Sequence, residues 1–390
     1  VRRQRQMCIR DRKEHEDILE QADETDAMFG ELYSWYLRNP EYRSRVQKLV
    51  QSAFAGKPED IISQSVAKAL YGEVSPYSAT RLERFAACAF AHFLQYGMKL
   101  TERVEYEFKP MDMGNVMHEA LESFAEEVRK RGMKWTELTE QERNEIADRC
   151  LDNIVADYGN TVLKSSARNE YMIERTRRIL RRTVWALQKQ LEQGEFQPEG
   201  FEVTFGGGRI DRVDIMEDQN KVYVKVIDYK TGNTSFDLVY LYHGLQLQLM
   251  IYLDGALRVE QKKYPDKEII PAGVFYYNIK DPMIQEKIDA DVEAVSAGLM
   301  KELKMNGLAQ ADPELVYRMD SSLGSIPVAF NKDGSFRKNS SVADRTQFAV
   351  LGRYVRTKIE KIRSSILEGD AEVSPYAVSY THLRAHETGA

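Results

Sequence analysis

One stretch, residues 205–230, constrains the fold of this chain more than any other. Two runs that alternate apolar and polar residues, 208–216 and 221–230, flank a short polar turn. Alternation with a period of two is typical of half-buried β-strands, so the pattern predicts an antiparallel hairpin. In the second run Asp228 and Lys230 are two residues apart. Both therefore point to one face of the strand, roughly 7 Å apart.

The first run supplies a second carboxylate for that face. If the hairpin folds about residues 218–219, Asp211 lies opposite Val226 and joins Asp228. Two carboxylates bind a hard cation such as Mg²⁺, which brings a water that can act as nucleophile, and a lysine can neutralise developing phosphate charge. The pattern indicates phosphodiester hydrolysis. An ordinary polar hairpin is the alternative, but an unpaired Asp228 ending a buried strand would be costly.

Five motifs between about residues 71 and 376 resemble, in order, the carboxy-terminal nuclease region of the AddB/RexB family. They are S-A-T-R-L-E-R-F-A-A-C-A-F at 78–90, G-N-V-M-H at 114–118, G-R-I-D-R-V-D at 208–214, D-Y-K at 228–230 and Q-L-M-I-Y at 248–252. In that family the region is a RecB-like member of the PD-(D/E)xK superfamily. The resemblance implies an α/β nuclease core, with a mixed central sheet flanked by helices.

The resemblance also implies a role for each matching residue. His118, Asp211 and Asp228 would be metal ligands, with Lys230 as the catalytic lysine. Gln248 and Tyr252 would hold the DNA or support the catalytic site. Taken alone, a histidine at the edge of a helix at 116–129 is more often structural, and a polar pair four residues apart on a helix is unremarkable.

The cysteines suggest an incomplete second site. Cys88 matches the first ligand of the family's 4Fe–4S cluster, but the three closely spaced cysteines near the family's carboxyl end are missing here. Cys150, in a helical run, is expected to be a buried core residue. We therefore expect a cluster in full-length family members and none in this chain.

Charge limits how this chain could hold DNA. The formal net charge is −6, and residues 1–12 contribute five arginines and one aspartate, so the remainder carries about −10. An acidic domain needs local basic groups or a partner to bind nucleic acid. The candidates for DNA contact near the proposed site are Arg209, Arg212, Lys225 and Lys230, and for the first three a solvated surface position is the default. Three cysteines and no long apolar run favour the cytoplasm.

Four regions are expected along the chain. Residues 1–12 and 377–390 look like adapter-derived read-through, 13–70 like a helical remnant of a preceding helicase-like region, and 71–376 like the nuclease domain. A T-x-x-E capping box at residues 80–83 would open the helix that leads to Cys88. The further helices are expected at 116–131, 139–158, 168–193, 243–261 and 342–367, and the strands at 201–206, 208–216, 221–230, 272–278 and 326–330.

The preferred hypothesis is a Mg²⁺-dependent deoxyribonuclease, an exonuclease module that processes DNA ends and single strands. No G-x-x-x-x-G-K-[ST] motif is present, so ATP hydrolysis would belong to a partner, which the resemblance implies is an AddA-type helicase-nuclease subunit. A stand-alone iron–sulfur single-strand exonuclease is the first alternative. A catalytically silent scaffold that binds DNA or a partner is the second.

Overall fold

A computed structural model describes most of the chain, which divides into two compact units, residues 1–60 and 61–390. The described residues are 23–54, 61–72, 78–101, 110–157, 167–206, 208–283 and 292–376. The first unit contains α2 (Asp23–Arg38) and α3 (Pro40–Phe54). The expected read-through ends lie outside the described residues, and the expected boundary at 70–71 falls at the end of α4 (Gln64–Tyr71), which packs on α14.

The second unit is built on a mixed six-stranded sheet with the strands in chain order. The β1–β2, β2–β3 and β4–β5 pairs are antiparallel, whereas β3–β4 and β5–β6 are parallel. The strands are β1 (Gln197–Phe205), β2 (Gly208–Asp218), β3 (Lys221–Lys230), β4 (Glu268–Asn278), β5 (Asn306–Gln310) and β6 (Val342–Ala343). The expected α/β class with a mixed central sheet is confirmed.

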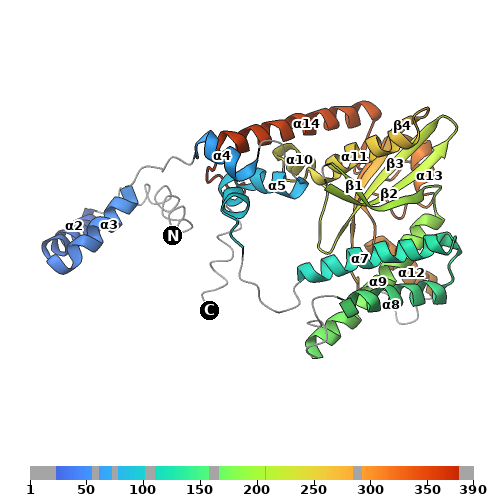
Figure 1. Cartoon of the computed structure of the whole chain (residues 1–390), viewed down its shortest axis with the longest axis horizontal. Coiled ribbons are helices and arrows are strands. Elements are labelled where there is room, and N and C mark those ends of the chain that lie inside the picture. The colour runs from blue at the N-terminus through green and yellow to red at the C-terminus, as the bar shows by residue number, and fades with distance from the viewer. Residues whose placement is uncertain are drawn as a thin grey trace. The chain divides into compact units, whose positions relative to one another are not determined.

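Helices cover both faces of this sheet (Figure 1). One face carries α7 (Pro110–Lys130), α8 (Glu140–Asp157) and α9 (Ala167–Glu192), and the other carries α11 (Gln248–Lys263) and α14 (Arg345–Glu368). The remaining short helices are α5 (Ala79–Ala87), α6 (Ala89–His92), η1 (Phe93–Gly97), η2 (Trp135–Glu137), α10 (Leu238–His243), α12 (Val292–Glu302) and α13 (Pro313–Met319). Among the described residues, no helix combines the length and apolar character needed to cross a membrane.

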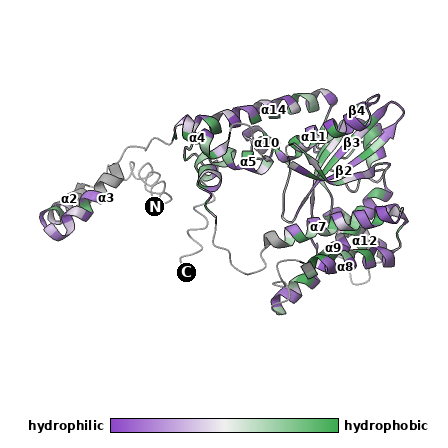
Figure 2. Cartoon of the chain, viewed as in Figure 1, coloured by the Kyte–Doolittle hydropathy of each residue, from purple (hydrophilic) through white to green (hydrophobic). Residues whose placement is uncertain are grey.

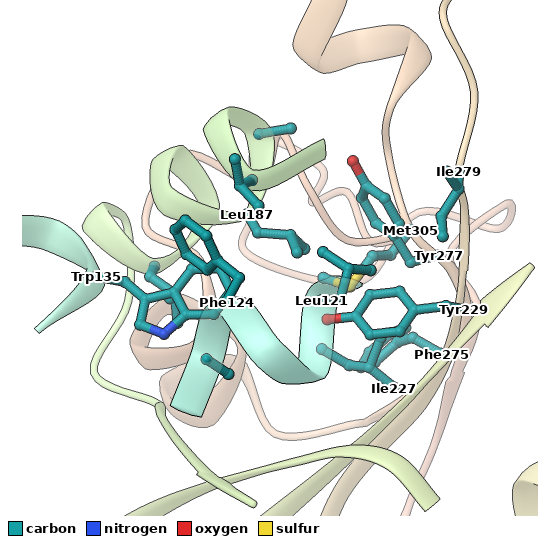
Figure 3. Close-up of a cluster of buried hydrophobic side chains, with 14 of the residues drawn as sticks. Leu121, Phe124, Trp135, Leu187, Ile227, Tyr229, Phe275, Tyr277, Ile279 and Met305 are labelled. Carbon is teal, nitrogen blue, oxygen red and sulfur yellow. The ribbon is translucent and has the colours of Figure 1, made fainter. Parts of the chain in front are cut away.

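Each face of the sheet buries its own apolar core, which explains why the helices carry apolar as well as polar residues (Figure 2). Leu121 of α7 lies beside the strand residues Ile227, Tyr229 and Phe275, whereas Phe124 of α7 packs against Trp135 (Figure 3). Burying such side chains contributes about 1.5–3 kcal/mol each. Strands sandwiched in this way are buried on both faces, which matters for the charged residues that they carry.

The hairpin register differs from the expected one by two residues. Asp218 pairs with Lys221, so residues 219 and 220 form the turn, and Val226 pairs with Val213 rather than with Asp211. The physical reason is that a two-residue hairpin turn needs a left-handed backbone, which Gln219 adopts with φ 45°. A shift of two residues keeps every side chain on its expected face.

Three secondary-structure elements also differ from the expected ones. The helix expected at 243–261 is two helices, because Gly244 adopts a left-handed φ of 85° and ends α10 before α11 begins. Residues 326–330 form no strand, only an isolated bridge between Phe330 and Phe336. The helix α7 starts at Pro110, so His118 lies in its third turn rather than at its start. The helix α14 ends at Gly369, which adopts a left-handed φ of 90°.

Candidate active site

Three carboxylates occupy adjacent positions on three neighbouring strands. The pairs Phe201 with Arg212 and Val203 with Ile210 place Glu202 of β1 opposite Asp211 of β2. Continuing the β2–β3 register one step beyond its last pair places Asp211 beside Asp228 of β3. Neighbouring strands lie about 4.8 Å apart, so these acids form a short row across the sheet. Only 7% of the Glu202 side chain, 10% of Asp211 and 1% of Asp228 is exposed.

The backbone of β1 is irregular at this row. Phe201 packs against the core under α7, whereas Val203, two residues further, packs against the core under α11. In a regular strand both would face one side. The change of face occurs at Glu202, whose φ of 49° is unusual for a residue other than glycine and costs about 1–3 kcal/mol. Sequence reasoning missed Glu202, since nothing local marks this bend.

His118 reaches the row from α7. Its Nδ1 lies 3.4 Å from Asp211 Oδ2 and 3.8 Å from Glu202 Oε1. Candidate ligand atoms of these three residues all lie within 4.8 Å of one another, which is close enough to share one cation. Burial lowers the pKa of His118, but hydrogen bonds and charge from the neighbouring acids outweigh it and raise the pKa to about 10. The acids thus create a strongly cation-attracting pocket.

Asp228 adds an unsatisfied carboxylate beside that pocket. Lys230 Nζ forms an ion pair with its Oδ2 at 2.7 Å, whereas Oδ1 has no hydrogen-bond partner within the described part of the chain. Burial, followed by the charge of Asp211, raises its pKa to about 7 against the opposing charges of Lys230 and His118. A buried carboxylate with spare acceptor capacity fits a cation ligand, because burial without a partner is costly.

Gln248 and Tyr252 lie where the sequence pattern placed them, on one face of α11 and next to Lys230. Lys230 Nζ donates a 2.8 Å hydrogen bond to Gln248 Oε1, and Gln248 Nε2 donates one of 2.9 Å to the Tyr252 hydroxyl. The Tyr252 ring meets the edge of Phe205, with ring centroids 5.8 Å apart. The amide of Gln248 therefore fixes the position of the Lys230 ammonium.

The expected capping box at Thr80 and Glu83 is wrong, and the correction adds a residue to the site. Ser78 caps α5, because its side chain accepts from the Arg81 amide. Glu83 instead accepts from the backbone amides of Leu247 and Gln248, at 2.7 and 2.9 Å, and so caps α11. These partners are more than 160 residues apart in sequence, so no local pattern could indicate the contact.

We expect Glu83→Gln to flatten the pH dependence of stability between about pH 4.5 and 7. Burial raises the pKa of Glu83 from 4.5 to about 7, so the folded protein binds the proton more tightly than the unfolded chain. Wild-type stability therefore falls as pH rises through this window, by at most about 3 kcal/mol. Glutamine keeps an acceptor oxygen without the charge. Urea titrations of Glu83→Gln and of the exposed-site control Glu314→Gln, at several pH values, check this; parallel curves for wild type and Glu83→Gln would refute it.

Two of the basic residues expected near DNA are not available to it. Arg212 is 2% exposed and Lys225 5%, and both form ion pairs with the buried Asp214, Lys225 at 3.0 Å. The expectation of a DNA contact for Arg212 is wrong, because helices cover both faces of the sheet and bury residues 210–216 of β2. Arg209 is 64% exposed and is ion-paired with Glu202, which places it at the rim of the site.

Cys88 is a half-buried residue at the C-cap of α5. Cys150 is buried in the core under α7 and α8, as expected. Among the described residues, the group close enough to hold a metal ion consists of His118, Glu202 and Asp211 and includes no cysteine. The described chain therefore does not supply the four thiolates of an iron–sulfur cluster.

An α/β sheet that gathers carboxylates, an imidazole and a lysine at one end of a hairpin defines the class of metal-binding nucleases. The family model for the PD-(D/E)XK nuclease superfamily matches residues 76–377, and the chain belongs to that superfamily. The match includes every residue of the site described above, from Glu83 to Tyr252.

Several curated proteins, all of them subunits of an ATP-dependent helicase/deoxyribonuclease, are similar over most of this chain. The subunit from Lachnoclostridium phytofermentans is 41% identical over 377 residues, covering 90% of this chain and 32% of that protein. The proteins of the same name from Alkaliphilus metalliredigens and Thermoanaerobacter sp. are 35% and 33% identical, covering 90% and 91% of this chain and 32% and 33% of those proteins. The chain thus spans about a third of the length of these relatives.

Proposed function

We propose that this chain is the nuclease module of a bacterial helicase–nuclease subunit and hydrolyses phosphodiester bonds of DNA with Mg²⁺. The observation that carries the proposal is the convergence of His118 from α7, Asp211 from β2 and Asp228 from β3 beside Lys230. These groups come from distant parts of the chain, and their burial costs stability that a structural role would not require.

The donor set fits a divalent cation, which His118, Asp211 and Asp228 would hold, with Glu202 as an added carboxylate. When bound, such a cation supplies an activated water and neutralises phosphate charge. Lys230 presents its ammonium to the same region and would stabilise negative charge that develops on the phosphate oxygens. Gln248 and Tyr252 would keep this ammonium in place, and Arg209 at the rim would contact the DNA backbone.

The substrate and partner follow from the relatives. Their name joins a helicase with a deoxyribonuclease and describes one subunit of an assembly. We propose that this chain acts as an exonuclease on DNA strands delivered by a helicase partner of the AddA type, in the cytoplasm, during processing of double-strand ends. A 4Fe–4S cluster would belong to longer relatives and stays a prediction for them.

His118→Ala should lower Mg²⁺-dependent cleavage of an end-labelled DNA strand by at least about 100-fold, because one ligand of the cation is lost. A chelator should stop cleavage by wild type. His243→Ala, at an exposed histidine, is the matched control and should cleave normally. Equal cleavage by wild type, His118→Ala and His243→Ala would contradict the proposed site. No cleavage by any of them would favour the alternative of a catalytically silent scaffold. Product lengths distinguish exonuclease from endonuclease action.

A further inference from the structure

A second feature of the surface is a groove between α11 and α14. Both helices lie on the face of the sheet opposite α7 (Figure 1). The groove consists of two adjoining cavities of about 640 and 450 Å³. The two cavities share four lining residues, Met250, Asp254, Gly352 and Arg356, and therefore lie side by side. We call this feature the basic groove.

The cations of the basic groove follow helical spacing on both of its walls. They are Arg258 and Lys262 on α11 and Arg345, Arg353, Arg356 and Arg363 on α14. Residues three, four or seven apart lie on one face of a helix, so each wall presents a row of positive charge along its length. From Arg345 to Arg363 the row extends roughly 27 Å at the helical rise.

The groove carries a positive charge, whereas the chain as a whole is negatively charged. Six cations and two carboxylates, Asp254 and Glu360, line it, although the whole chain carries −6. Asp254 is shared between Arg258 at 2.7 Å and Arg356 at 2.9 Å, and Arg345 pairs with Glu268. Within the described ranges no carboxylate pairs with the exposed Lys262 or Arg353. The internal pairs thus leave a surplus of positive charge, which attracts a polyanion.

One end of the groove lies next to the candidate active site. Phe205 and Gly206, at the β1–β2 turn, line the larger cavity. The Phe205 ring lies against Gly255, where an added Cβ would come within 2.6 Å of the ring, and it makes a T-shaped contact with the Tyr252 ring. Tyr252 accepts the hydrogen bond of Gln248, which contacts Lys230. The contacts from Phe205 through Tyr252 and Gln248 therefore connect this end of the groove with Lys230 of the site.

We propose that the basic groove binds the phosphodiester backbone of single-stranded DNA that enters or leaves the candidate active site. This inference rests on the proposed function. Charge complementarity and continuity with the site favour nucleic acid over a protein partner as the occupant. A groove between two helices suits one strand, whose phosphates the two rows of cations would contact, as in other sequence-tolerant single-strand sites.

The test is the affinity of a fluorescent oligothymidylate, measured by anisotropy in a chelator so that nothing is cleaved. The double variant Lys262→Gln/Arg353→Gln removes two cations that hold no ion pair among the described residues, and Arg175→Gln/Lys332→Gln removes the same charge from exposed positions elsewhere. We expect the groove variant to raise Kd roughly tenfold and to reduce the single-strand salt slope by about 1.4. The control should bind as wild type does.

Equal Kd values for wild type and the groove variant would overturn the proposal and leave a protein as the occupant. Equal weakening in both double variants would overturn it as well, because it would reflect bulk charge. Cleavage of a dinucleotide in Mg²⁺ separates this inference from the proposed function. The groove variant should cleave it at the wild-type rate, since a dinucleotide does not reach the groove. Failure of wild type to cleave any substrate would count against the proposed function alone, because binding is measured without catalysis.

Discussion

Asp228→Asn is expected to reduce Mg²⁺-dependent DNA cleavage by about 10³-fold or more while making the cation-free protein more stable. Asparagine has the same shape but cannot place a negative charge beside the cation. Catalysis should therefore lose the cation and its activated water together. The opposite sign for stability comes from the burial of this carboxylate, of which 1% is exposed, next to Asp211.

The sign of the stability effect can be worked out from the proton equilibrium. Burial and the neighbouring Asp211 raise the pKa of Asp228 from 3.8 to about 7, so wild-type stability falls as the pH rises from about 3.8 to 7 and stays at the lower level above pH 7. The amide has no charge at any pH. At pH 8 without divalent cations, Asp228→Asn should raise the free energy of unfolding by about 1–3 kcal/mol.

Single-turnover cleavage assays and urea titrations, each with and without Mg²⁺, measure both effects. Asp266→Asn, in an exposed turn, is the control and should change neither quantity. Mg²⁺ should stabilise wild type and the control but not Asp228→Asn. A variant that still gains stability from Mg²⁺ and still cleaves would show that Asp228 is not a ligand.

The hairpin and its functional face were predictable because they depend on local periodicity. The alternation of 208–216 and 221–230 identified both strands, and Asp211, Asp228 and Lys230 meet at one site as expected. The register was wrong by two residues, because the sequence did not show which turn residue takes a left-handed backbone. A register shift of two residues keeps every side chain on the same face. Asp211 and Asp228 therefore still share a face, as predicted.

Other parts of the site depend on contacts that no local pattern encodes. Glu202 joins the acidic row through a left-handed backbone in β1, and Glu83 caps a helix far away in sequence. For Arg212, sequence reasoning proposed a DNA contact that the structure excludes. The place of Arg212 near the proposed site made it a candidate for DNA contact, but helices pack on both faces of the sheet, so both faces of β2 are buried at residues 210–216.

Lys230→Met is expected to separate catalysis from cation binding, which Asp228→Asn cannot do. The ammonium is fixed by Asp228 Oδ2 at 2.7 Å, by Gln248 Oε1 at 2.8 Å and by the Tyr276 ring, whose centroid is 5.6 Å away. Such a preorganised charge stabilises negative charge on the reacting phosphate at little cost of reorganisation. Methionine keeps an apolar stem and removes the charge, so cleavage should fall by about 10³-fold.

The affinity for the cation should increase in Lys230→Met, because a positive group next to the bound cation is lost. Its removal also raises the pKa of Asp228, which the ammonium lowers in wild type, so calorimetric Mg²⁺ titrations belong at alkaline pH, where that carboxylate is ionised. Under these conditions Lys230→Met should bind Mg²⁺ at least as tightly as wild type yet fail to cleave DNA. The control Lys221→Met replaces an exposed lysine on the same strand and should bind Mg²⁺ and cleave DNA as wild type does. Loss of Mg²⁺ binding in Lys230→Met would mean that the lysine supports the architecture of the pocket, whereas retained cleavage would mean that the ammonium takes no part in the reaction.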